Sequence, residues 1–171
     1  MQKDFSYPLK IDELGQGEQH YKLTANEAQL GELGIILQIP AVNKFQADLL
    51  VNFQKRSGKL TVSGKVEANL RLTSVISLEE FDREYQTQFS QTYDTTATYE
   101  EIREQDEDIS MDIPDVVYDG KIDLGDICIE QIALIMEDNP RQAGEEFTPI
   151  ISAAEETPNN PFSVLAKLKK N

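Results

Sequence analysis

Apolar and polar residues alternate through the middle of the chain. From Phe45 to Phe53 and again from Leu60 to Leu72, most of the apolar residues share one parity and so fall on one face. A period of two is typical of strands that bury one face. Lys55 to Gly58 separates the two runs and has the composition of a turn, so the pattern predicts a long hairpin.

Two further runs alternate in the same way. Tyr85 to Tyr93 predicts the strand after the hairpin, reached through a connection from Leu78 to Phe81. Phe5 to Ile11 predicts a first strand, and Pro8 suits an edge position because it lacks a backbone donor. Four or five antiparallel strands with one polar face need an apolar element to cover the other face.

The segment from Leu124 to Glu137 is predicted to form a helix that covers this face. It is apolar nearly all round, and such helices are usually buried. Asp123 is the expected N-cap, Asp126 suits the positive end of the helix, and Asn139-Pro140 should stop it.

A shorter helix is expected before the hairpin. Thr24 and Glu27 have the spacing of a capping box, and Gly34 is placed to end the helix in the left-handed conformation. Ile35 to Ile39 then predicts a short buried strand or the approach to one. The predicted fold class is therefore α+β, an antiparallel sheet or partly closed barrel-like sheet covered by a few helices.

The expected organisation is a single domain over residues 1–141, followed by a flexible linker and a short C-terminal amphipathic helix over 142–171. Within the domain, residues 94–110 carry seven acids and few apolar groups, which predicts a mobile acidic loop. In the C-terminal segment Phe162, Leu165 and Leu168 share one helical face.

The formal net charge is −15, with a pI near 4.4. A field of this sign repels phosphate backbones and attracts basic partners, although acids also simply keep a small protein dissolved. The single cysteine, Cys128, permits no intrachain disulfide and is expected to act as a buried hydrophobe. Neither a membrane span nor a signal peptide is evident, so the expected location is the cytoplasm.

Common catalytic and cofactor motifs do not occur, and we expect no catalytic, cofactor-binding or metal-binding residues. His20 lies in a polar stretch that predicts a solvated side chain. Asp126 and Glu130 share a helix face and could serve acid–base chemistry, but carboxylates at a helix start have a sufficient local role. Glu130 then belongs to the polar stripe, or is a buried acid paired with Arg71 or Arg83.

Several segments together resemble the YceD family, the large ribosomal RNA subunit accumulation proteins of bacteria and plastids. They are Phe5 to Pro8, Ser74 to Phe81, Asp123-Leu124-Gly125 with Glu130-Gln131 and Pro140-Arg141, and Pro161 to Lys169. Many members carry a Cys-x-x-Cys pair where this chain has Ser74 and Ser77. Two hydroxyls do not replace two thiolates as soft-metal ligands, so no metal or redox role is carried over.

The resemblance implies a non-enzymatic factor in synthesis, processing or stability of the large-subunit (23S) ribosomal RNA. The expected partners are ribosomal proteins or large-subunit assembly intermediates, with RNA contact only indirect or local and no membrane. The alternatives are an acidic chaperone-like binder of basic ribosomal proteins and an RNA-processing enzyme. The candidate partner-contact residues are Asp123, Glu130, Arg141, Phe162, Leu165, Leu168, Lys167 and Lys169.

The C-terminal segment has two open interpretations. Its apolar face either packs on the domain or occupies a partner's groove, where Lys167, Lys169 and Lys170 would touch RNA locally. The sequence does not fix the oligomeric state.

Overall fold

The main body of the chain is a five-stranded sheet. The computed structural model describes residues 5–96, 115–117 and 119–146. The strand order is β2-β3-β4-β5-β6, antiparallel throughout except for the parallel pair β5-β6. These strands span Gly17–Thr24 (β2), Ala41–Gln54 (β3), Lys59–Thr73 (β4), Glu80–Asp94 (β5) and Asp115–Val116 (β6).

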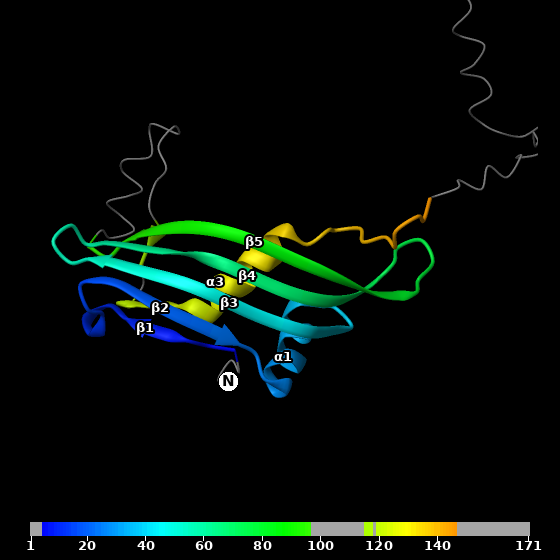
Figure 1. Ribbon diagram of the computed structural model, residues 1–171, viewed down its shortest axis with the longest axis horizontal. Helices are drawn as coiled ribbons and strands as arrows, with labels where there is room; N and C mark the ends of the chain where they lie inside the picture. The colour runs from blue at the N-terminus through cyan, green and yellow to red at the C-terminus, as the bar shows by residue number, and fades with distance from the viewer. Residues whose placement is uncertain (1–4, 97–114, 118, 147–171) are drawn as a thin grey trace, which may run out of the picture.

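Smaller elements lie against this sheet (Figure 1). A two-stranded sheet pairs β1 (Pro8–Lys10) with β7 (Lys121–Asp123), and a 3-10 turn, Ile11–Glu13, follows β1. Helix α1 (Glu27–Leu37) packs against β3, and helix α3 (Leu124–Ile135) crosses β4 and β5. One face of the sheet is therefore covered. Within the described part of the chain, no helix or strand lies on the opposite face, which we call the open face, and the strands do not close into a barrel.

The core forms between the sheet and α3, where the inward side chains of the strands meet the buried face of the helix. The buried side chains include Phe45 of β3, Leu60 and Leu70 of β4, and Leu124 and Ile132 of α3. Phe5 also enters this core, and its ring packs edge-on against those of Tyr7 and Phe45. Burial of these large side chains is the main source of stability for such a fold.

The α+β prediction is confirmed, as are the long hairpin and the covering helix. β3 and β4 pair along almost their full length, and the residues predicted to face inward are buried. The run from Tyr85 to Tyr93 lies within β5, with both end tyrosines buried. Helix α3 ends at Ile135, four residues before Asn139-Pro140, because Met136 leaves the helix in an extended conformation.

The predicted boundaries of the first helix are wrong. The N-cap is Asn26, whose side chain accepts from Gln29 N while the Gln29 side chain accepts from Asn26 N. The helix also continues past Gly34 to Leu37, and Gln38 adopts the left-handed conformation that was expected of the glycine. The strand predicted over Ile35 to Ile39 is therefore absent from this stretch.

Strand β2 was not predicted from the sequence, because only Tyr21 and Leu23 mark its inward face. His20 on this strand is exposed, as expected. The acidic loop, apart from residues 94–96, and the C-terminal segment with Phe162, Leu165, Leu168, Lys167 and Lys169 lie outside the described residues.

Candidate interaction surface

Asp123 joins the start of α3 to the N-terminal segment. Its Oδ1 accepts hydrogen bonds from the backbone N–H groups of Gly125 (2.8 Å), Asp126 (3.2 Å) and Tyr7 (2.9 Å). The Ser6 hydroxyl donates to Oδ2. The predicted N-cap is confirmed, and the carboxylate is engaged within the chain.

Gly125 permits the close approach that this junction requires. A Cβ atom at this position would lie 2.2 Å from the carbonyl oxygen of Phe5. The Leu124 N–H also donates to the Tyr7 carbonyl at 3.1 Å, so the N-terminal backbone runs directly against the helix start. Asp123, Leu124 and Gly125 therefore all hold the N-terminal segment against the start of α3.

The other ionisable groups of α3 do not gather into a reaction centre. Glu130 is exposed, which supports the polar-stripe interpretation, and the alternative of a buried ion pair with Arg71 or Arg83 is wrong. Those arginines pair with Asp82 and Glu137. Cys128 is fully buried, and burial, followed by the nearby Asp123, raises the pKa of its thiol to about 12. Its thiolate is therefore strongly disfavoured at neutral pH.

Ser74 organises the turn between β4 and β5 and attaches it to the segment after α3. Its buried hydroxyl donates to the Glu145 carboxylate and accepts from Ile76 N (3.1 Å) and Ser77 N (3.3 Å). A second link runs from Val75 N to the Pro140 carbonyl at 3.0 Å. We call this set of contacts the turn clamp. Its serines are the pair singled out in the sequence, but its partner Glu145 was missed.

Arg141 lies beside the turn clamp. Its side chain is exposed, while its carbonyl accepts from Arg83 Nη2 at 2.6 Å. Arg83 also pairs with Glu137. The structure thus places Arg141 near the far end of α3, Asp123 at its start and Glu130 between them on its exposed side. Their role in partner contact stays a prediction.

The turn clamp should respond to acid. Hydrogen bonds from Ser74 first and Ser77 next, with a further one from Gln142 N, hold the pKa of Glu145 below its usual range. A carboxyl with a lowered folded pKa stabilises the folded form above its unfolded pKa, and this contribution disappears as pH falls through the folded value. We therefore expect the hydrogen-exchange protection factor of the Val75 amide to fall when pH drops through the carboxyl range.

Glu145→Gln is the matched control for this prediction. Glutamine keeps an oxygen acceptor but does not titrate in this range. The protection factor of Val75 should be lower in the variant at neutral pH and should lose most of its acid dependence. An equal acid dependence in both proteins would show that another group controls the turn.

Large apolar side chains are exposed near the turn clamp and on helices α1 and α3. Leu78, in the turn, is 75% exposed and has a φ of 63°, which is rare for a leucine. Its backbone is held by a bond from Leu78 N to the Ser74 carbonyl at 3.0 Å. Val75 is also exposed, as are Leu134 at the end of α3 and Ile35 on α1. Exposed apolar side chains that lie together can mark a contact with another macromolecule, and Val75 and Leu78 share this turn.

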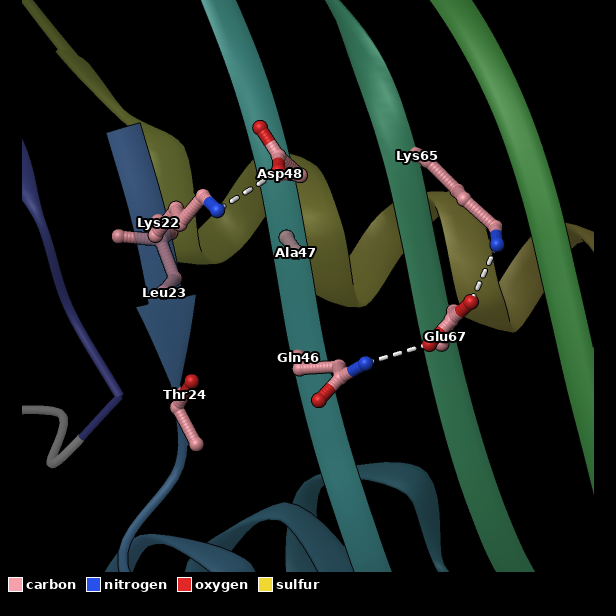
Figure 2. A pocket seen from close by; sticks show the side chains of 8 residues that line it. All are labelled: Lys22, Leu23, Thr24, Gln46, Ala47, Asp48, Lys65 and Glu67. Atoms are coloured by element: carbon pink, nitrogen blue, oxygen red, sulfur yellow. Dashed lines mark hydrogen bonds and ion pairs between the residues drawn. The ribbon is translucent and has the colours of Figure 1, made fainter. Parts of the chain in front are cut away.

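The open face of the sheet carries a shallow hollow of about 310 Å³ over β2, β3 and β4. Figure 2 shows its charged side chains paired with one another: Lys22 with Asp48 at 3.5 Å, and Lys65 with Glu67. Gln46 also donates to Glu67, and the Lys65 and Gln46 hydrogen bonds lower the pKa of that carboxyl. Exposed pairs of this kind contribute little to stability. They neutralise the lysines that would otherwise attract an anion.

The fold and these surfaces define an acidic α+β domain built on an open antiparallel sheet. Among the described residues, no three His, Cys, Asp or Glu side chains gather as a metal site, and no helix is long and apolar enough to cross a bilayer. A sequence model of the family described as large ribosomal RNA subunit accumulation protein YceD matches residues 62–169. The chain belongs to the YceD family. No curated protein and no solved structure matches it significantly.

Proposed function

We propose that this chain is a non-enzymatic accessory factor for synthesis, processing or stability of large-subunit (23S) ribosomal RNA. It works in the cytoplasm through contacts with basic ribosomal proteins or assembly intermediates. The observation that carries the proposal is a net charge of −15 on a member of the YceD family. Such a charge favours encounter with basic proteins and opposes direct approach to a phosphate backbone.

The described surfaces support this proposal. The carboxylate of Asp123 is engaged by backbone and Ser6 donors, and the thiol of Cys128 is buried with a raised pKa, so neither is presented for chemistry. What the domain presents instead is an open polar sheet face and exposed apolar groups such as Leu78. A chaperone-like role toward unassembled ribosomal proteins rests on the same charge and differs only in the state of the partner.

Recovery of partners from a lysate at increasing salt tests the proposal. Tagged full-length protein should recover large-subunit precursor RNA together with ribosomal proteins, and nuclease treatment should leave those proteins bound. Purified chain should bind isolated large-subunit ribosomal proteins but not protein-free precursor RNA, and should not cleave that RNA with magnesium present. Tight binding to the naked RNA, with affinity falling linearly in log–log terms as salt rises, would contradict the proposal.

A further inference from the structure

In the part of the chain that the structure describes, strand β5 has no strand neighbour along most of one edge. Among the described residues, β6 pairs only with Tyr93 and Asp94 on this side, while β4 pairs with all of β5 on the other. The side chain of Arg83 reaches the carbonyl of Arg141 near the other end of β5. The open edge therefore runs from Glu84 to Thr92.

The direction of the backbone groups along this edge follows from two hydrogen bonds. The carbonyl of Asp94 accepts from Val117 N at 3.4 Å, away from β4, whereas Thr95 N donates to the Gly58 carbonyl on the β4 side at 2.9 Å. Successive residues of a strand point their backbone groups in opposite directions. Five residues therefore present N–H and C=O groups to the open edge: Glu84, Gln86, Gln88, Ser90 and Thr92.

Beyond Glu84 at one end, the open edge lacks the devices that usually protect a sheet edge. Residues 85–92 include no proline, no lysine and no charged residue, and the register with β4 has no bulge. The opposite edge strand, β2, is shorter, carries Lys22 on its exposed side and begins at Gly17. An unprotected edge of this length readily accepts an additional strand.

The charges around the open edge favour an incoming strand with a positive charge. Glu84 is exposed at one end, and Asp115 lies at the other, where it accepts from Gln91 Nε2 at 2.5 Å. Burial first, then Asp115 and Glu130, raises the pKa of Tyr93, which indicates that both carboxylates lie near this end. A basic segment would meet acids at both ends, whereas a second copy of this chain would bring another net charge of −15.

We infer that the edge of β5 from Glu84 to Thr92 is a docking site for an extended basic segment of a partner protein, which adds to the sheet as a sixth strand. Backbone hydrogen bonds supply the pairing, and the acids at the two ends favour lysine and arginine on the incoming segment. This inference rests on the proposed function, because it specifies how a basic ribosomal protein is held.

A synthetic peptide of alternating lysine and valine residues tests the site on the full chain. The peptide should bind with micromolar to millimolar affinity, measured by fluorescence anisotropy, and should bind more weakly as salt rises. The same peptide with alternate backbone nitrogens methylated keeps every charge but loses hydrogen-bond donors. It should bind at least about tenfold more weakly, because several backbone hydrogen bonds are lost at once.

Two proline variants locate the site. Gln88→Pro removes an N–H that faces the open edge, and an edge strand tolerates this change in the fold. The matched control is His20→Pro on β2. Ala25 N, just after this strand, donates to the Phe45 carbonyl on β3. Because backbone groups alternate in direction along a strand, His20 N, five residues earlier, points away from β3. Gln88→Pro should weaken peptide binding about tenfold while His20→Pro leaves it unchanged, since only the first interrupts the β5 edge. Unchanged circular dichroism would establish that both variants are folded.

Several outcomes would overturn the inference: equal binding of the methylated peptide, equal loss in His20→Pro, or absence of binding to the wild-type chain. A wild-type dimer that strengthens with salt and dissociates in Gln88→Pro would show that a second copy occupies the edge. The lysate experiment separates this inference from the proposed function. Full recovery of ribosomal proteins by Gln88→Pro refutes only the docking site, whereas no recovery by the wild-type chain refutes the function.

Discussion

Gly125→Ala is expected to destabilise the fold by on the order of 3 kcal/mol, because a new methyl group must fit where there is no space. The added Cβ would lie 2.2 Å from the Phe5 carbonyl oxygen, which belongs to the backbone and cannot rotate away. Phe5 is fully buried and packs against Phe45, so displacing it disturbs the core as well. The loss should appear as a lower urea midpoint with an unchanged slope.

Gly31→Ala is the matched control for this prediction. Gly31 lies in α1, is exposed, and would meet nothing within 4 Å of an added Cβ. Alanine is the better helix former, so this variant should gain up to about 1 kcal/mol. If Gly125→Ala were as stable as wild type, the close approach of the N-terminal segment to α3 would be wrong.

Asp123→Ala is expected to cost about 3 kcal/mol, the second large effect. The substitution removes the N-cap of α3, which alone is typically worth about 1 kcal/mol. It also leaves Tyr7 N and the Ser6 hydroxyl without their acceptor in a partly buried site, and such unsatisfied donors add to the cost. Urea unfolding measures the total, and faster hydrogen exchange of the Tyr7 amide would show that the N-terminal segment has loosened.

Asp123→Asn separates geometry from charge in the same site. Asparagine retains a side-chain oxygen for Gly125 N, Asp126 N and Tyr7 N, and it is an equally good N-cap residue. We expect it to keep most of the stability that alanine loses. An asparagine variant as unstable as the alanine variant would mean that the negative charge, rather than the hydrogen bonds, holds the junction.

These two predictions give a physical reason for Asp123-Leu124-Gly125, one of the segments on which the family resemblance rests. Asp123 and Gly125 are required because the N-terminal backbone from Phe5 to Tyr7 runs directly against the start of α3. Partner contact by Asp123 would have to use a carboxylate that already accepts these bonds. Glu130, exposed on the same helix, is better placed for that purpose.

The sequence predicted those parts of the fold where side-chain periodicity is strong. The inward residues alternate from Phe45 to Phe53 in β3 and from Leu60 to Leu72 in β4, so the pattern alone predicts their pairing. Asp123 was identified as a cap because its residue type and its position before an apolar run both indicate a helix start. Cys128 was expected to be buried because it lies inside the apolar run, and it is.

Competing local signals and distant contacts account for what the sequence could not predict. Two overlapping cap patterns, Thr24 with Glu27 and Asn26 with Gln29, have the same spacing, and pairing of Thr24 with Gln46 in the sheet decides between them. Gly34 has the residue type of a helix end, but the helix continues to Leu37, and the Gly34 carbonyl accepts from Ile39 N at 3.0 Å. Ser74 and Glu145 meet across 71 positions of sequence, and no spacing rule reports such a contact.

The turn clamp also fixes where the rest of the chain departs. Glu145 is bonded beside the β4–β5 turn, at one end of the long sheet (Figure 1). Phe162 follows Glu146 by sixteen residues, which at full extension span roughly 50 Å. A molecule bound by Phe162, Leu165 and Leu168 would therefore lie within about that distance of this end of the sheet, and the turn clamp decides which part of the domain it can reach.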